Sequence, residues 1–159
     1  MKRRTKSRGP RASSIARVPG IDYAGLDGVL GYALRRAQLA GFEAFHAATA
    51  GFDMTPPRYT ALVIVGANPG LTQSTLGAVL GTARSGAMLL TDWLEERGLA
   101  RRRRRNGDGR AWGLHLTPRG RSLGAQLRRR VHARDAAFAR RLAPAERAAL
   151  RRLLDKLTG

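Results

Sequence analysis

Apolar residues recur at helical spacing along most of the chain. From about residue 27 to residue 50, leucine and phenylalanine recur every three to five positions, at Leu30, Leu34, Leu39, Phe42 and Phe45. This spacing predicts a long amphipathic helix. Its apolar stripe is wider than one small domain needs, so we expect the helix to be buried on two sides.

Several short helices follow, with turn residues between them. Thr55, followed by two prolines, predicts the start of the first. Thr72 is expected to cap the next helix and Gly81 to end it, and Thr82 is expected to cap a longer helix over about 83–97. Two short helices joined by a glycine-containing turn match the spacing of a helix-turn-helix.

A hairpin and two more helices complete the pattern. A turn of sequence Asn-Gly-Asp-Gly lies between a run of arginines and an alternating apolar strand, Trp112, Leu114 and Leu116, which predicts two antiparallel strands. Thr117 and Pro118 begin a helix to about residue 141, and Pro144 begins the last one. The expected fold is mainly α with a small β-hairpin: a winged helix-turn-helix at about 55–118, flanked by long helices at about 28–50 and 118–158.

The charge balance indicates a polyanionic partner. The 159 residues contain 30 Lys and Arg against 11 Asp and Glu, a net charge of +19. DNA, RNA or an anionic membrane surface would each suit such a chain. No cysteine is present, which excludes disulfides, Cys-based zinc sites and thiol chemistry. No apolar run approaches the roughly 18 residues of a membrane span.

The N-terminal stretch has its own composition. Residues 1–20 carry seven basic side chains and no acidic one, and no apolar segment of the kind found in secretory signals follows them. An organelle transit peptide is the less favoured interpretation, because no amphipathic face accompanies the charge. We expect residues 1–26 to form a disordered basic arm. Contact with nucleic acid and a mere gain in solubility are equally good explanations of it.

Four short motifs occur in order along the predicted helix-turn-helix and hairpin: Asn68-Pro69-Gly70-Leu71-Thr72-Gln73, Asp92-Trp93-Leu94-Glu95-Glu96-Arg97-Gly98-Leu99, Asp108-Gly109-Arg110 and Leu114-His115-Leu116-Thr117-Pro118-Arg119-Gly120. Together they resemble the MarR family of dimeric winged helix-turn-helix regulators, from about Leu30 to Leu157. The resemblance implies a cytoplasmic homodimer that binds a pseudo-palindromic operator in double-stranded DNA, with repression as the family default.

The resemblance also implies that the helix over about 83–97 enters the major groove. Arg84 and Ser85 are candidates for base contacts, because arginine to guanine is the commonest specific contact. Met88 has two interpretations, contact with a thymine methyl group or packing inside the domain, and packing is favoured. Three residues that open the preceding helix suit a phosphate oxygen, although capping explains them equally well: Thr72, Gln73 and Ser74.

The hairpin supplies the remaining DNA candidates. Alternate residues of a strand face opposite sides, so two or three of its five arginines face DNA and the others face solvent or acidic partners such as Glu95 and Glu96. Arg110 is expected to enter the minor groove, held by Asp108. A solvated strand and a surface ion pair are the alternatives. The arginines assigned to the DNA side are Arg101, Arg103 and Arg105.

Members of the family often bind a small aromatic or phenolic ligand between the dimer helices and the winged domain. An arginine and a histidine beside aromatic rings would suit a carboxylated aromatic ligand. Ordinary core packing is the favoured explanation of these side chains. The candidates are Arg36, Phe42, Phe45, His46, Met54 and Tyr59.

Nothing in the sequence supports catalysis, and we expect no cofactor and no metal. The three histidines lie on different predicted elements and lack metal-ligand spacing. A different function class remains open: a sequence-nonspecific architectural DNA binder or an RNA-associated basic protein. The small number of polar residues on the predicted recognition helix favours it, and the resemblance speaks against it. A regulator that acts only through protein contacts suits the charge least.

Overall fold

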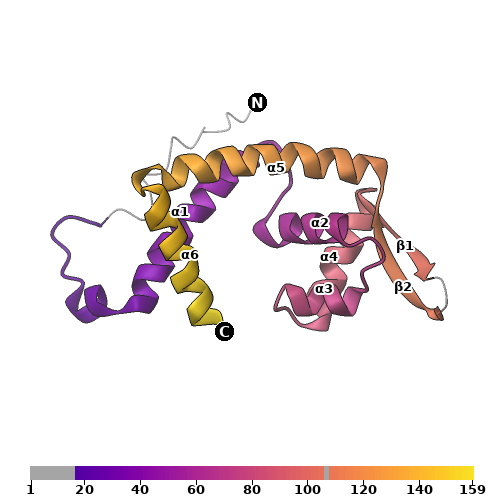
Figure 1. Cartoon of the computed structure of the whole chain (residues 1–159), viewed down its shortest axis with the longest axis horizontal. Helices are drawn as coiled ribbons and strands as arrows, with labels where there is room; N and C mark the ends of the chain where they lie inside the picture. The colour runs from indigo at the N-terminus through magenta and orange to yellow at the C-terminus, as the bar shows by residue number, and fades with distance from the viewer. Residues whose placement is uncertain (1–16, 106–107) are drawn as a thin grey trace, which may run out of the picture. The chain divides into compact units, whose positions relative to one another are not determined.

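The computed structural model describes residues 17–105 and 108–159, without the side chains of residue 105 and residues 108–111. It has the predicted mainly helical fold with one two-stranded hairpin (Figure 1). None of the helices in the described residues combines the length and apolarity that a bilayer crossing requires. The elements in order are η1 (Ala24–Gly28), α1 (Leu30–Ala48), α2 (Pro56–Ala67), α3 (Gln73–Val79), α4 (Arg84–Glu96), β1 (Ala100–Arg105), β2 (Asp108–Leu116), α5 (Pro118–Phe138), η2 (Ala139–Arg141) and α6 (Pro144–Thr158).

The chain divides into two compact units, residues up to Glu43 and residues from Ala44 onward. In the first unit, the Tyr23 and Tyr32 rings lie 6.3 Å apart and the Arg17 guanidinium lies 5.2 Å from the centre of the Tyr23 ring. Most apolar side chains of this unit are solvent-exposed in the single chain: Val18, Ile21, Leu26, Val29, Leu30, Leu34 and Phe42.

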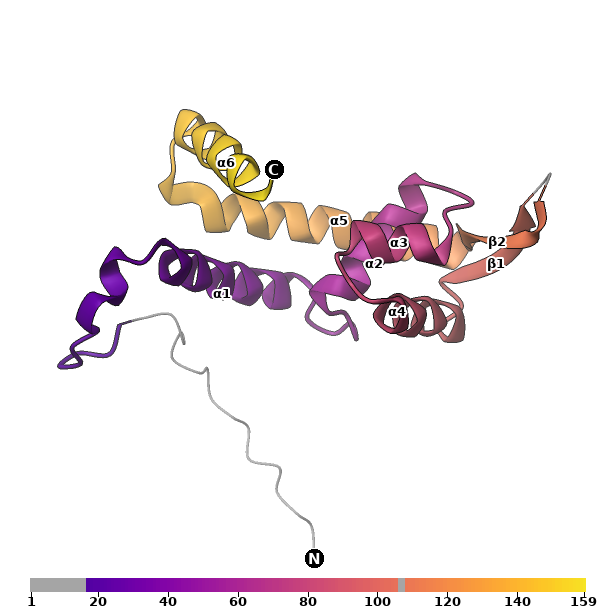
Figure 2. The ribbon, with the colours of Figure 1, turned by 90° about the horizontal axis from the view of Figure 1, so that it is seen from below.

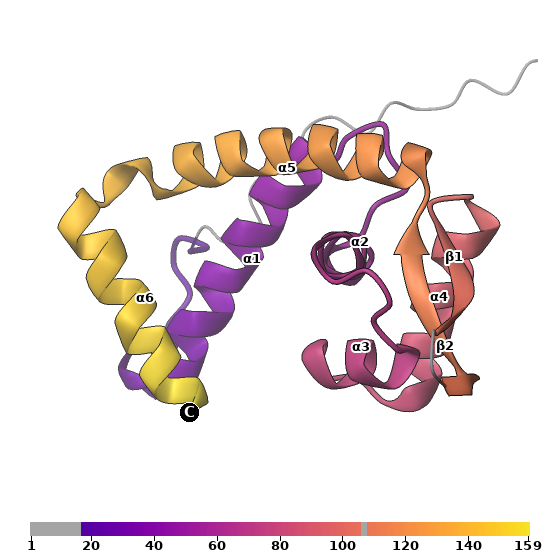
Figure 3. The ribbon, with the colours of Figure 1, turned by 45° about the vertical axis from the view of Figure 1, so that its right-hand side comes forward.

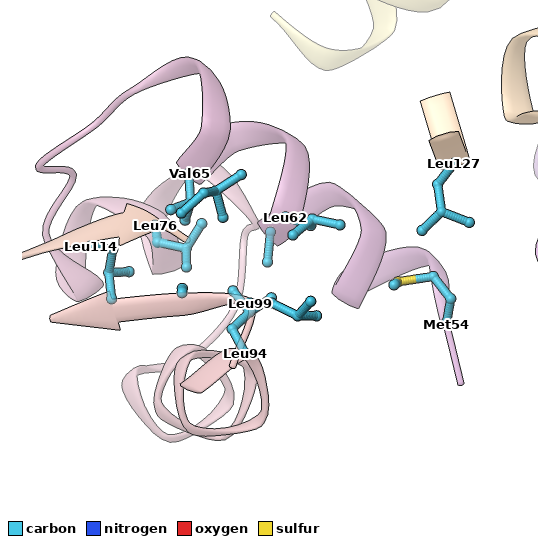
Figure 4. Close-up of a cluster of buried hydrophobic side chains, with 11 residues drawn as sticks. Met54, Leu62, Val65, Leu76, Leu94, Leu99, Leu114 and Leu127 are labelled. Atoms are coloured by element: carbon cyan, nitrogen blue, oxygen red, sulfur yellow. The ribbon is translucent and has the colours of Figure 1, made fainter. Parts of the chain in front are cut away.

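The hydrophobic core belongs to the second unit. It is formed by α2, α3, α4, the hairpin and the first half of α5 (Figure 4). A fully buried leucine stabilises a fold by about 1.5–3 kcal/mol. The largest fully buried apolar side chains are Leu62, Val65, Leu76, Leu94, Leu114 and Leu127.

Threonine caps fix three helix starts as predicted. Thr55, Thr72 and Thr117 each accept a hydrogen bond from the backbone N–H three residues later. The predicted cap at Thr82 is wrong, because α4 begins at Arg84 and its N-cap residue, Ala83, has no side-chain cap. The Thr82 backbone N–H instead donates to the Gly77 carbonyl and closes the turn after α3.

The hairpin has two different faces. Arg102 is paired with Leu114 and Arg104 with Trp112, so these residues share one face, whereas Arg101 and Arg103 lie on the other. The other edge of β2 is also paired: the Gly70 N–H donates to the Leu114 carbonyl, and Leu71 forms a bridge with Leu114. A β-carbon on Gly113 would lie 2.7 Å from the Gly70 carbonyl oxygen, so only glycine allows this approach.

The C-terminal helices extend beyond the core. The helix expected to reach residue 141 ends at Phe138, and the 3₁₀ turn η2 leads into α6, which leaves the end of α5 at an angle (Figure 2). One face of α6 is apolar, and it remains exposed in the single chain. Its members are Leu150, Leu153, Leu154 and Leu157.

Candidate nucleic-acid interface

The helices α3 and α4 and the hairpin lie next to one another (Figure 3). A groove lies among them. The groove has a volume of about 600 Å³ and lies between α3, the start of α4 and β2. Four predicted DNA residues line it, and so does Trp112, which is half-exposed and was predicted only as a strand residue. The four predicted residues are Thr72, Gln73, Ser74 and Arg84.

The start of α3 is occupied by internal hydrogen bonds. The Thr72 hydroxyl accepts from the Thr75 N–H at 3.2 Å and is hydrogen-bonded to the Ser74 hydroxyl at 2.9 Å. The Gln73 side-chain oxygen accepts from Arg102 at 3.3 Å. The Thr72 hydroxyl therefore caps α3, and the Gln73 side chain contacts Arg102 on the hairpin.

The outer face of α4 is less polar than a DNA-reading helix usually is. Arg84 and Ser85 are exposed in the first turn. Met88 is 47% exposed and Leu89 is 67% exposed, so the prediction that Met88 packs inside the domain is wrong. The buried face of the helix consists of Ala87, Thr91 and Leu94.

Arg102 joins the hairpin to α4. Its guanidinium lies 2.8 Å from an Asp92 oxygen and 2.5 Å from a Glu95 oxygen. Its backbone N–H also donates to Glu95 at 2.9 Å. The sequence left Arg102 and Arg104 to face solvent or acidic partners such as Glu95, but it missed Asp92 and did not distinguish between these two arginines. We call Arg102, Asp92, Glu95 and Gln73 the wing cluster.

The other hairpin arginines have different surroundings. Arg101 and Arg103 are exposed, as predicted for the DNA side. The Arg104 guanidinium lies 5.6 Å from the centre of the Trp112 ring. The side chains of Arg105, Asp108 and Arg110 lie outside the described residues, so their assignments and the expected Asp108–Arg110 pair remain predictions.

A second ionic cluster also contacts the C-terminal half of α4. The Asp53 carboxylate is 2.5 Å from both Arg58 and Arg97, and these guanidinium groups lie 4.5 and 5.4 Å from the centre of the Trp93 ring. We call these four residues the linker cluster, because Asp53 lies between α1 and α2.

The charges of the linker cluster shift the ionisation of Asp53. Desolvation raises the pKa of this carboxyl group, but Arg58 and Arg97 outweigh it, so the pKa lies below its ordinary value. The Trp93 indole N–H is close enough to contribute to the lowering, although it has no partner at good hydrogen-bond geometry.

The predicted ligand residues are divided between the two units. Phe45 lies 5.9 Å from the His46 ring and 5.6 Å from the Tyr59 ring, and burial raises the pKa of Tyr59. Met54 belongs to the core and also lines a cavity of about 440 Å³. Two of the candidates, Arg36 and Phe42, lie in the first unit. Among the described residues, no group of acidic or histidine side chains is arranged to hold a metal.

The helix-turn-helix with its basic hairpin is the architecture of a winged-helix DNA-binding protein. A family model described as MarR family matches residues 52–111. A relative from Thauera aromatica, described as a putative transcriptional regulatory protein for the hcr operon, is 36% identical over 153 residues, which cover 96% of this chain and 91% of the relative. The chain belongs to the MarR family and is a DNA-binding transcriptional regulator.

Solved structures of other regulators are similar over most of this chain. The transcriptional repressor CouR bound to a 23-mer DNA duplex superposes with a TM-score of 0.82 and 34% identity, covering 87% of this chain and 99% of CouR. CouR bound to p-coumaroyl-CoA gives a TM-score of 0.79 at 33% identity, with 87% and 97% coverage. PcaV from Streptomyces coelicolor in complex with its natural ligand gives a TM-score of 0.76 at 29% identity, covering 89% of this chain and 97% of PcaV.

Proposed function

We propose that this protein is a homodimeric repressor that binds a pseudo-palindromic operator and is released by an aromatic acid or its thioester. The observation that carries the proposal is the groove that α4 shares with the hairpin, with Arg84 in its lining and Ser85 exposed beside it. Arg101 and Arg103 are exposed on the other face of the hairpin. The similarity to CouR, solved on a DNA duplex, supports DNA binding through α4 and the hairpin.

In this proposal α4 enters the major groove and the hairpin lies along the phosphates. The Arg101 and Arg103 side chains neutralise phosphate charge, and the wing cluster keeps the hairpin at a fixed position beside α4. A net charge of +19 adds a nonspecific attraction that falls steeply with salt.

A second copy of the chain would cover the exposed apolar faces of the terminal helices. The leucines of α6 and the apolar residues of η1 and α1 are exposed in the single chain. Water-exposed apolar surface of this extent is uncommon on monomers. A two-fold dimer would place two copies of α4 about one turn of DNA apart.

Similar proteins and a few aromatic and basic side chains of this chain support an aromatic acid or its thioester as the ligand. CouR has been solved with p-coumaroyl-CoA, and the Thauera aromatica relative is assigned to the hcr operon. In this chain His46 would bind the anionic end of the ligand, and the rings of Phe45 and Tyr59, which lie 5.6 Å apart, would contact its aromatic part. We expect His46→Ala to weaken release by ligand while leaving DNA affinity unchanged, with His132→Ala on α5 as the control.

Fluorescence anisotropy with two duplexes tests the proposal. One duplex carries the DNA upstream of this protein's own coding sequence, and the other carries the same bases in scrambled order, both at about 150 mM salt. We expect the native duplex to bind about 10³-fold more tightly. Addition of p-coumarate or p-coumaroyl-CoA should then release it, and the pair of ligands separates the free acid from the thioester. Specific binding that neither ligand changes would refute the ligand part alone.

A sequence-nonspecific DNA or RNA binder is the second candidate, favoured by the exposed apolar residues of α4. Equal affinity for the native and scrambled duplexes, together with equal affinity for operators chosen by selection from random sequences, would favour this candidate over a repressor.

A further inference from the structure

The exposed surface of α4 contains two large apolar side chains that the protein fold does not use. Met88 and Leu89 are 47% and 67% exposed, although they lie in the middle of the domain's recognition helix. The other large exposed apolar groups are mostly on the terminal helices, where a second copy can cover them. No such explanation applies to α4, because it packs with α2, α3 and β1 through its opposite face.

Met88 and Leu89 lie beside the polar residues expected to reach DNA. Spacings of three and four residues place Ser85, Met88 and Leu89 on one side of the helix, with Arg84 next to Met88. Asp92 extends this side by one turn, but its carboxylate is bonded to Arg102. The open surface of α4 therefore presents the Arg84 guanidinium and the Ser85 hydroxyl, followed by the apolar side chains of Met88 and Leu89. The nearest acidic group, the Asp92 carboxylate, is already paired with Arg102.

The chemistry of the major groove offers one apolar group to such a surface. Adenine, guanine and cytosine present hydrogen-bonding atoms there, whereas thymine adds the C5-methyl group. Arg84 and Met88 are one helical turn apart, about 6 Å along the axis, so they reach different base pairs. We propose that Met88 and Leu89 recognise thymine through its methyl group, so that part of the operator is read by apolar contact. This inference rests on the proposed DNA-binding function.

Deoxyuridine substitution tests this directly, because deoxyuridine lacks only the C5-methyl group of thymidine and keeps its hydrogen-bonding atoms. Each thymine of the operator half-site is replaced in turn, using the upstream duplex or one selected from random sequences. Burial of a methyl group predicts a loss of about fourfold in affinity at one or two positions. Wild-type affinity that is unchanged at every position would overturn the inference.

Two variants assign the methyl contact to residues. We expect Met88→Ala and Leu89→Ala to bind the native operator more weakly, and each to lose its sensitivity to deoxyuridine at one position. Both sites are exposed and alanine favours helix, so the fold should be retained, which a thermal melt checks. Val79→Ala is the matched control, because Val79 is 54% exposed on α3 and does not line the groove.

The outcomes separate this inference from the proposed function. Equal binding to every duplex would refute sequence-specific recognition and the methyl contact together. Specific binding with no deoxyuridine effect would refute only the methyl contact. A deoxyuridine effect that remains equally large in Met88→Ala and in Leu89→Ala would also overturn the assignment, because another residue would then contact the methyl group.

Discussion

The wing cluster and the linker cluster both hold α4, but their charges are arranged in opposite ways. In the wing cluster one cation, Arg102, is shared by two carboxylates and an amide, and its side chain is 32% exposed. In the linker cluster one carboxylate, Asp53, is shared by two arginines and is 49% exposed. Loss of the central residue therefore leaves uncompensated negative charge in the first cluster and uncompensated positive charge in the second.

The difference matters because DNA is a polyanion. An unpaired Asp92 or Glu95 would repel phosphates beside the recognition helix, whereas unpaired Arg58 and Arg97 would not. The wing cluster also connects the two elements that face DNA in the proposed complex, while the linker cluster connects α4 to the segment before α2. We therefore expect the wing cluster to control DNA affinity and the linker cluster to control mainly stability.

The largest effect is expected for Arg102→Met. It removes the guanidinium contacts with Asp92 and Glu95, so that the backbone N–H bond to Glu95 is left to join β1 to α4, and it leaves two carboxylates uncompensated. Operator affinity should therefore fall about 30-fold. Arg101→Met on the same strand is the control and should cost only a few-fold. Anisotropy titrations of both variants measure this. Equal losses would mean that Arg102 acts as an ordinary surface charge, and Glu95→Gln should partly restore Arg102→Met.

The tip of the hairpin should have the next largest effect. We expect Arg110→Ala to weaken operator binding at least tenfold without dissociating the dimer, because a single arginine in a narrow minor groove meets an enhanced negative potential. Anisotropy gives the affinity and size-exclusion chromatography gives the oligomeric state. Unchanged affinity would show that the hairpin acts through the strand arginines alone.

Arg102 also shows how much of the structure could be predicted from the sequence. Helix caps, turn glycines and the hairpin turn are local signals, so Thr55, Thr72 and Thr117 were placed correctly and the order of elements was confirmed. The alternation of the strand left Arg102 and Arg104 for solvent or acidic partners, but five identical residues could not show which of the two meets Asp92 and Glu95. That choice depends on the register of the hairpin, in which Arg102 is paired with Leu114 and Arg104 with Trp112, and on the position of α4.

One residue of the recognition helix, Met88, was assigned wrongly for a related reason. Residues 87–90 read Ala-Met-Leu-Leu, so every position in that stretch is apolar and residue type alone left both packing and exposure open for Met88. The structure buries Ala87 and exposes Met88 and Leu89. The start of α4 was likewise assigned to a cap at Thr82, but the hydrogen bond from Thr82 to Gly77 ends the preceding turn there.

Salt dependence gives a finer separation of the two kinds of arginine. An arginine that neutralises a phosphate contributes about 0.9 to the slope of log affinity against log salt. Arg103→Gln should reduce the slope by about that amount, because Arg103 is exposed and has no acidic partner among the described contacts. Arg102→Gln should lower affinity with a smaller change in slope, because its partners are carboxylates. Titrations from about 100 to 300 mM salt would measure both, and equal slope changes would contradict the distinction.

The smallest effect on DNA binding is expected for Asp53→Asn, and its effect on stability should depend on pH. In the folded protein Arg58 and Arg97 lower the pKa of Asp53, although desolvation acts in the opposite direction and raises it. A lowered carboxyl pKa contributes stability that is present above the unfolded value of 3.8 and is lost as the pH falls through the folded value. Thermal melts at pH 7 and near pH 3 should therefore show a larger fall in Tm for the wild type than for Asp53→Asn, with operator affinity at pH 7 changed by less than about threefold.

Glu96→Gln, at the same end of α4 but outside the linker cluster, is the control for Asp53→Asn. A loss of operator affinity in Asp53→Asn as large as that of Arg102→Met would mean that the linker cluster also determines how α4 meets DNA, and the proposed division between the two clusters would fail.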